Sequence, residues 1–188
     1  MIRSNYLARN ASNARDRRGL RDRDKLDSEN GILCFSEDWT DPVLWTHYGA
    51  KHRGICLGFD VKDGFAKKIV YREDRVRDAE IRGKTDKEIL DLLLLTKFES
   101  WRYEQEWRVL LNLSDSIGEG GLHFYKFDKQ LKLTEVILGA ECSMTHKEVQ
   151  HLVSTHHPQA NTIKARLAFE SFHIVPDEPT IKHIPPGN

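Results

Sequence analysis

A stretch near the middle of the chain, residues 98–113, most constrains what this sequence can fold into. It reads FESWRYEQEWRVLLNL. In its second half, Trp107, Val109 and Leu111 alternate with other positions and the apolar run continues, which predicts a buried β-strand over residues 104–113. We expect the rest of the chain to be organised around this strand.

The first half of the same stretch carries an unusual group of charged side chains. Side chains two positions apart on an extended chain leave the same face, so we expect Glu104, Glu106 and Arg108 to lie together. Three aromatic side chains surround the pair of glutamates: Trp101, Tyr103 and Trp107. Two interpretations are open. The group is either a site at the mouth of an apolar strand, or the solvated face of an edge strand with weak ion pairs.

Length and composition favour one folded domain between two polar ends. The chain has 188 residues, which suits a single domain with a sizeable core. Its four Trp and eight Phe argue against disorder. We expect a basic arm or helix over residues 1–30, one domain over residues 31–175, and an extended, proline-rich tail over residues 176–188.

The charge of the chain is unevenly placed although the formal net charge is zero. Residues 1–25 contain eight basic and three acidic residues, a net +5, so the remainder carries −5. A basic amino end can bind nucleic acid through its phosphates. Because Asp residues interrupt the basic ones, a charged helix lying on the acidic side of the domain is the other interpretation.

Cysteine usage and hydropathy predict a cytoplasmic protein. The cysteines, Cys34, Cys56 and Cys142, are odd in number and form no C-x-x-C motif, as expected of reduced thiols. The Arg-rich start has no apolar run after it, so we expect no signal peptide. No segment has the ~18 apolar residues of a membrane span, so we expect no membrane partner.

Local patterns predict an α+β fold with a mostly antiparallel or mixed sheet and a few flanking helices. Asp41 and Pro42 suit the start of a short helix, and capping boxes at Thr85 and Thr145 predict longer ones, to residue 95 or 98 and to about residue 156. Strands are expected over residues 31–36 (fully buried), 53–60, 66–71, 122–127, 133–138, 163–169 and 172–175. The glycines of residues 53–60 predict a bulge or a close backbone approach. Regular βαβ alternation is absent from this pattern.

Two stretches remain as candidate sites once other chemistry is weighed. The nine histidines lack metal-ligand spacing, so we expect no metal, and no nucleophile or phosphate-loop motif occurs. Trp45 and Tyr48 could form a wall on which a flat ring stacks, or Trp45 could be a core residue and Tyr48 a half-buried surface aromatic. The carboxylates of Glu104 and Glu106 suit a reaction through an oxocarbenium ion, because fixed negative charge stabilises a developing sugar cation.

The same stretches resemble a known bacterial family. The matching segments, in order, are residues 32–36 (ILCFS), 44–49 (LWTHYG), 52–60 (HRGICLGFD) and 101–108 (WRYEQEWR). This order of motifs is similar to that of the domain of unknown function 2971 family over residues 31–139. The family pattern is in turn similar to the ADP-ribosyltransferase fold, in which three motifs on separate elements hold NAD.

The resemblance implies roles for individual residues. Tyr48 would flank the nicotinamide. Glu106 would form a hydrogen bond to the nicotinamide ribose and stabilise its oxocarbenium ion. Glu104 would orient the acceptor, and Arg108 would be structural. NAD would be the substrate, and no metal is expected. The site is expected between four residues: Ser36, Trp45, Tyr48 and Glu106.

One family feature is missing, and other functions stay open. Residues 1–30 do not resemble the aromatic–His–Tyr–Thr-like strand with which family members begin. The amino end is therefore not native, or another subunit completes the site, or the site is inactive. The resemblance implies a toxin or phage-defence effector with a nucleic-acid or protein acceptor. The alternatives are a metal-dependent nuclease, with Mg²⁺ held by Asp60, Glu104 and Glu106, and a non-catalytic module that binds nucleic acid or protein.

Overall fold

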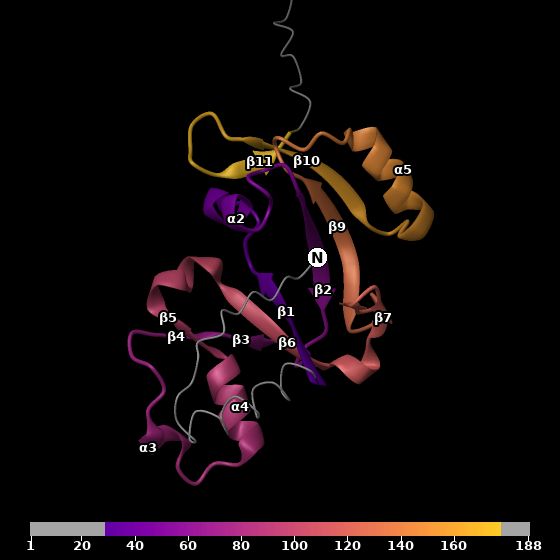
Figure 1. Ribbon diagram of the computed structural model, residues 1–188. Coiled ribbons are helices and arrows are strands. Elements are labelled where there is room, and N and C mark those ends of the chain that lie inside the picture. The colour runs from indigo at the N-terminus through magenta and orange to yellow at the C-terminus, as the bar shows by residue number, and fades with distance from the viewer. Residues whose placement is uncertain (1–28, 178–188) are drawn as a thin grey trace, which may run out of the picture. The chain divides into compact units, whose positions relative to one another are not determined.

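The computed structural model describes residues 29–177, which form two compact units (Figure 1). The first unit contains the described residues up to Glu37 together with Lys62–Asp128, and the second contains Asp38–Val61 and the described residues from Lys129 onward. Both contain strands and short helices, which confirms the α+β class with antiparallel and mixed sheets. Among residues 29–177, no helix is long and apolar enough to cross a membrane.

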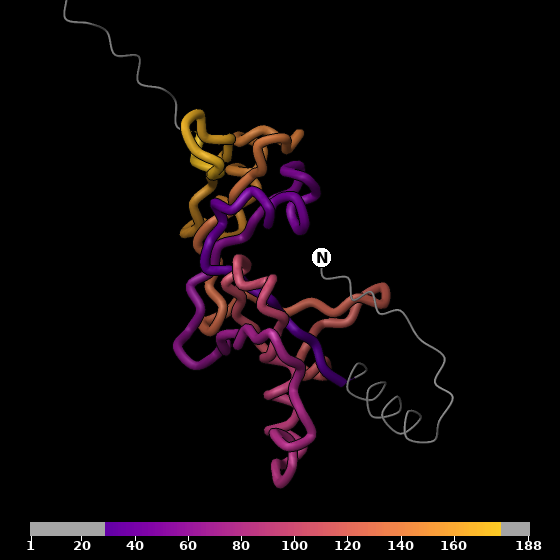
Figure 2. Tube along the Cα trace, turned by 90° about the vertical axis from the view of Figure 1, so that its left-hand side faces the viewer, coloured from indigo at the N-terminus to yellow at the C-terminus, as the bar shows by residue number. Residues whose placement is uncertain are grey.

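The first unit is built on a central strand that comes from the stretch singled out in the sequence. Its strands are β1 (Asn30–Ser36), β3 (Lys67–Lys68), β4 (Val70–Arg72), β5 (Thr96–Phe98), β6 (Glu106–Asn112), β7 (Ile117–Glu119) and β8 (Leu122–Phe124). An antiparallel sheet has the order β1-β6-β3, so β6 lies in the middle. β4 and β5 pair in parallel, and β7 and β8 form a hairpin that extends away from the β1–β6 pair in Figure 2.

Short helices connect these strands. They are α3 (Asp78–Ile81), α4 (Asp86–Leu94) and the 3₁₀ helices η1 (Glu99–Glu104) and η2 (Leu113–Asp115). α4 begins at the predicted capping box, where Thr85 and Glu88 bond each other's backbone N–H groups. The helix ends at Leu94, since the chain continues from Thr96 as strand β5.

Several predictions for the first unit are wrong in detail. β1 is half-buried rather than fully buried, because it lies at the edge of its sheet and has β6 on one side alone. The strand expected over residues 66–71 is two short strands with different partners. The chain between β6 and β8, for which no element is predicted beyond residue 113, contains η2 and β7.

The second unit is a four-stranded mixed sheet. Its strands are β2 (Ile55–Val61), β9 (Leu131–Leu138), β10 (Asn161–Leu167) and β11 (Ile174–Pro176), in the order β11-β10-β9-β2. β9 is antiparallel to β2 and parallel to β10, and α5 (His146–His156) makes the crossover between β9 and β10. The predicted irregularity is confirmed, since the β2–β9 register shifts between Gly58 and Phe59.

Helices cover both faces of this sheet because the side chains of β9 alternate between them. Val136 and Leu138 pack with Val149 and Val153 of α5. On the opposite face, Ile137 packs with a cluster that includes the tryptophan of α2 (Pro42–His47). Figure 1 shows α5 and α2 on the two sides of the strands. Leu138 is completely buried, so the core of this unit lies along β9.

Candidate functional site

The two glutamates of the central stretch are buried and share one lysine. Glu104 and Glu106 are 4% and 3% exposed. The ammonium of Lys97 in β5 donates to Glu104 Oε2, and to Glu106 Oε2 at 2.9 Å. The same ammonium lies 5.0 Å from the ring centroid of Trp101. Lys97 thus bridges two carboxylates and also contacts one aromatic ring.

Arg108 completes the cluster as the second cation paired with Glu106. Its Nε donates to Glu106 Oε1 at 2.7 Å and its Nη2 to Glu106 Oε2 at 3.1 Å, a two-pronged pairing that fixes the plane of the carboxylate. Its Nη1 donates to the backbone oxygen of Leu94 at the end of α4. We call Lys97, Glu104, Glu106 and Arg108 the carboxylate cluster.

The backbone route to the cluster differs from the one predicted. Glu104 is the last residue of η1 and Glu106 is the first of β6, so the two do not lie on one extended strand. Between them, Gln105 has a left-handed backbone with φ 45° and ψ 50°. The hydroxyl oxygen of Tyr71 accepts from the N–H of Glu106 at 2.8 Å and holds this corner. The turn, rather than a strand, brings both carboxylates to Lys97.

The alternative of a solvated edge strand is wrong. β6 is the middle strand of its sheet, and both carboxylates are almost completely removed from water. Burying two unpaired carboxylates would cost several kcal/mol each, and the two cations offset this cost by pairing and hydrogen bonding. The four formal charges of the cluster sum to zero.

Electrostatics keep Glu106 ionised at neutral pH. Burial raises the pKa of Glu106, but hydrogen bonds from Arg108, Lys97 and Cys34 outweigh it and hold the pKa below its ordinary value. Burial lowers the pKa of Lys97, and its bonds to Glu104 and Glu106 overcome this and raise it. Both groups are therefore charged, so Glu106 can accept hydrogen bonds and stabilise a cation but cannot act as an acid at pH 7.

Two residues of β1 face the cluster across the strand pairing. Ser36 is the register partner of Glu106, and Cys34 is the partner of Arg108. Burial and the hydrogen bond to Glu106 raise the pKa of Cys34 to about 11, so this cysteine is a neutral thiol at physiological pH. The structure thus brings Ser36 to the same end of β6 as Glu106.

The predicted aromatic wall belongs to the second unit and has two different parts. Trp45 is 3% exposed, packs in the core, and donates its indole N–H to the backbone oxygen of Trp39 at 2.6 Å. Its buried ring therefore serves as core. Tyr48, the C-cap of α2, is 67% exposed. Asp41 caps the start of α2 as predicted, accepting from Val43 N–H at 2.7 Å.

Sequence reasoning missed Lys97, which is central to the cluster. The sequence predicts a helix that ends at residue 95 or 98, so residues 96–98 fall at its possible end. A helix there gives no reason for Lys97 to pair with Glu104 or Glu106, whereas the structure has strand β5. The sequence does contain a signal for a strand here. Thr96 is β-branched and directly follows Leu95, the C-cap of α4, and Phe98 is aromatic, so residues 96–98 suit a short strand.

The carboxylate cluster is arranged for hydrogen bonding rather than for a metal. Among residues 29–177, no group of three or more His, Cys, Asp or Glu side chains is placed to hold a metal ion. The ammonium of Lys97 already stands between Glu104 and Glu106, and a cation placed there would be repelled by it. Asp60, the third ligand of the nuclease alternative, lies in β2 of the second unit.

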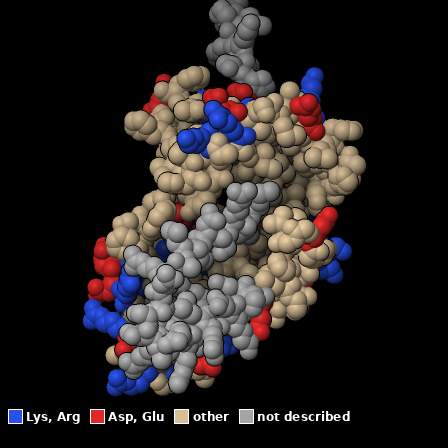
Figure 3. Space-filling view, viewed as in Figure 1, with Lys and Arg blue, Asp and Glu red and all other residues tan. Residues whose placement is uncertain are grey.

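Several surface charges of the first unit form ion pairs. On the face shown in Figure 3, basic and acidic side chains stand next to each other. Outside the carboxylate cluster, its described residues form five ion pairs: Lys67 with Asp91, Lys68 with Glu37, Arg72 with Glu80, Arg77 with Asp74, and Arg102 with Glu99. The basic segment 1–25, interpreted either as a nucleic-acid contact or as a charged helix on the acidic side of the domain, lies outside the described residues.

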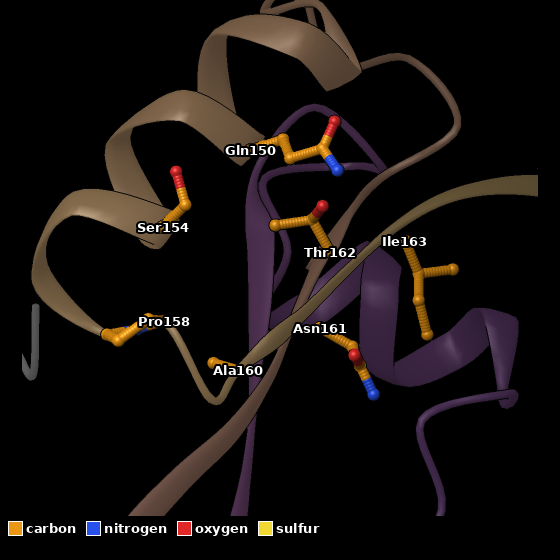
Figure 4. Close-up of a pocket in the computed structure, with 7 residues that line it drawn as sticks. All are labelled: Gln150, Ser154, Pro158, Ala160, Asn161, Thr162 and Ile163. Carbon is orange, nitrogen blue, oxygen red and sulfur yellow. The ribbon is translucent and has the colours of Figure 1, made fainter.

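A pocket of about 480 Å³ opens in the second unit between α5 and β10 (Figure 4). Gln150 and Ser154 of α5 and Asn161 and Thr162 of β10 supply its polar groups. None of the residues predicted for the site lines it. Its described lining holds amides and hydroxyls without a charged side chain, so it offers no counter-charge to a phosphate.

No family model, curated protein or solved structure matches this chain. The resemblance stated from the sequence motifs therefore stays a prediction, and so do the roles that it implies for NAD and for an acceptor. The cytoplasmic location expected from cysteine usage and hydropathy also stays a prediction. The domain boundaries at residues 30 and 175 also stay predictions.

Proposed function

We propose that the chain is an ADP-ribosyltransferase-like domain that uses NAD as its substrate, with the carboxylate cluster as its reacting centre. The observation that carries the proposal is a buried, ionised Glu106 whose two oxygens are held in fixed positions by Lys97 and Arg108. A preorganised charge stabilises a transition state without the cost of reorienting water.

In the proposed reaction the bond between the nicotinamide nitrogen and C1′ of its ribose breaks. The bonding electrons go to the ring nitrogen, which becomes neutral, and positive charge develops over C1′ and the ring oxygen of the ribose. Glu106 stabilises this oxocarbenium ion. Glu104 orients the acceptor, whose oxygen or nitrogen forms a new bond to C1′ and loses its proton to water.

A ribose hydroxyl can reach Glu106 only by replacing one of its present donors. Lys97 and Arg108 supply three charge-assisted hydrogen bonds, and Cys34 supplies a fourth from its thiol. A thiol is a weak hydrogen-bond donor, so replacing the bond from Cys34 by one from a ribose hydroxyl is favourable. We therefore propose that the ribose binds on the Cys34 side of Glu106.

The acceptor class follows from the family resemblance and not from the described residues. A nucleic-acid or protein acceptor, and a role as a toxin or phage-defence effector, are part of the proposal. The missing first family motif would fall within residues 1–30, nearly all of which lie outside the described range.

The test is the release of nicotinamide from NAD by the full chain, in the presence of mixed cellular RNA, DNA and protein as acceptors. We expect Glu106→Gln to lower the rate by about 10²–10³-fold, because it removes the fixed charge. Glu106→Asp keeps the charge but shortens the side chain, and should also lose most of the rate while retaining the fold. Glu99→Gln is the matched control, since Glu99 pairs with Arg102 outside the cluster.

Circular dichroism of each variant separates loss of chemistry from loss of fold. Equal nicotinamide release by wild type and by folded Glu106→Gln would overturn the assignment. Absence of release by the wild type with every acceptor would do the same.

A further inference from the structure

We propose that the turn between α2 and β2, residues 48–54, binds the phosphate of a nucleotide, with Lys51 and Arg53 as the phosphate-binding side chains and Tyr48 as the platform for the ring. The turn lies wholly within the second unit, so this inference is independent of the chemistry proposed for the carboxylate cluster.

The first observation is backbone strain concentrated in this turn. Ala50, Lys51 and His52 have φ values of 50°, 55° and 65°, three consecutive left-handed residues without a glycine among them. Each such residue costs about 1–2 kcal/mol relative to the right-handed conformation. Strain of this kind persists only where the surroundings enforce it, and it concentrates at functional sites.

Close backbone packing enforces the strained turn. Gly54 N–H donates to Gly49 O at 2.8 Å and closes the turn, and Gly139 N–H donates to Gly54 O at 3.0 Å. Glu141 N–H donates to His52 O at 2.9 Å. A Cβ on Gly139 would lie 2.1 Å from His52 O, so no larger residue fits there. These backbone contacts of Gly49, Gly54 and Gly139 fix the conformation of the turn that carries Lys51 and Arg53.

The second observation is the chemistry that this turn presents. From Val43 to Phe59 the chain contains Lys51 and Arg53 and no carboxylate, and the exposed Glu141, whose N–H donates to His52 O, is an acidic residue beside the turn. Both basic residues are exposed, so their charges can meet a ligand. Tyr48 directly precedes Gly49 and Arg53 directly precedes Gly54, so the Gly49–Gly54 hydrogen bond brings the backbone of these two exposed residues close together.

A third observation concerns the ring beneath the turn. His52 stacks on the buried Trp45, with ring centroids 6.2 Å apart and planes 12° apart. Its Nδ1 is buried and has no hydrogen-bond partner among the described residues. Orphaned buried polar atoms are rare in folded proteins, and each one calls for an explanation such as local strain or a bound water or ion. The orphan lies in the same strained turn as Lys51.

Two cations and a flat exposed ring fit a ligand that has both a phosphate and an aromatic base. Charge-assisted hydrogen bonds to phosphate are about twice as strong as neutral ones. A ring that stacks on tyrosine adds about 1 kcal/mol or more. A nucleotide carries both groups, whereas a nucleoside lacks the phosphate and inorganic phosphate lacks the ring.

The experiment compares nucleotides with their nucleosides on the full chain by isothermal titration calorimetry. The probes are AMP with adenosine, and nicotinamide mononucleotide with nicotinamide riboside. For at least one pair, we expect the nucleotide to bind wild type on the order of tenfold tighter or more than its nucleoside, and the difference to shrink with added salt.

The variant is Lys51→Gly with Arg53→Gln. Glycine suits the left-handed position, so the fold is kept while both charges are lost. The double variant should bind each nucleotide and its nucleoside equally. Lys132→Gly with Lys147→Gln, two exposed lysines of the same unit, is the control and should retain the difference.

The outcomes separate this inference from the proposed function. Equal wild-type binding of nucleotide and nucleoside in both pairs, or no binding of either nucleotide, overturns it whatever NAD turnover shows. A phosphate effect that survives in the double variant also overturns it. A phosphate effect that disappears in the double variant but not in Glu106→Gln supports it, even if no nicotinamide is released from NAD.

Discussion

Lys97 shows how one residue decides whether two buried carboxylates are tolerated. It contacts Glu104 and Glu106 at once, and its side chain is 19% exposed against 5% for each partner. Removing one member of a buried, balanced group leaves an uncompensated charge away from water, which costs more than the pair itself contributes. The cluster is therefore best probed by removing one charge at a time.

We expect Lys97→Met to lower the free energy of unfolding by about 3–5 kcal/mol, because two buried carboxylates then keep only Arg108 as a counter-charge. Urea denaturation measures this change. Lys67→Met is the matched control: Lys67 pairs with Asp91 at the surface, with side chains 49% and 28% exposed, and its loss should cost less than about 1 kcal/mol. Equal losses in the two variants would contradict the description of the cluster.

The pH dependence of stability has a defined sign. The pKa of Glu106 lies below 4.5 in the folded protein, so the unfolded chain binds a proton more readily and stability falls as the pH drops through and below that value. We expect the wild type to lose its stability advantage over Glu106→Gln progressively below about pH 5. Urea denaturation series from pH 3 to pH 7 measure the difference. A difference that grows toward acid would show that Glu106 is not held ionised.

At the scale of elements, helix α5 is fixed by its cap. Thr145 accepts from Glu148 N–H, and the Glu148 carboxylate accepts in return from Thr145 N–H at 2.7 Å. We expect Thr145→Ala to lower the free energy of unfolding by about 1 kcal/mol, while Thr155→Ala near the helix end should change it less. Thermal unfolding followed by circular dichroism would detect both. An effect of Thr145→Ala below that of Thr155→Ala would contradict the capping role.

Elements with a local signature were predicted from sequence, and elements without one were not. The starts of α2, α4 and α5 are predicted because each capping contact joins residues at most three positions apart, which can be recognised in the sequence. The pairs β3–β6 and β4–β5 are two or three residues long and depend on partners far along the chain. No periodicity can appear in so few residues.

The sequence predicts the two glutamates of the candidate site, but neither the backbone turn between them nor the lysine that pairs with them. Glu104 and Glu106 were identified from their spacing, yet the turn at Gln105 has φ 45°, a conformation that a strand pattern does not predict. Lys97 is seven residues from Glu104 in sequence, and it reaches both acids only because η1 folds the chain back. Such contacts depend on tertiary packing rather than on local preference.

For the whole molecule, charge is balanced, and the two proposed sites belong to different units. The net charge is zero, and the isoelectric point is about 7.1, so the protein has little overall repulsion near neutral pH. The first unit contains the carboxylate cluster and the second contains the basic, strained turn at Lys51. We propose sugar chemistry for the first unit and phosphate binding for the second.

The measurement that tests the central claim most directly is a titration of NAD followed by tryptophan fluorescence. Trp101 is 37% exposed and lies 5.0 Å from Lys97 Nζ, so nicotinamide bound at the carboxylate cluster should quench it. The account predicts saturable quenching below about 1 mM NAD, largely lost in Trp101→Phe and shifted to higher NAD in Glu106→Gln. No saturable change, or quenching that is the same in Trp101→Phe, would contradict NAD binding at the carboxylate cluster.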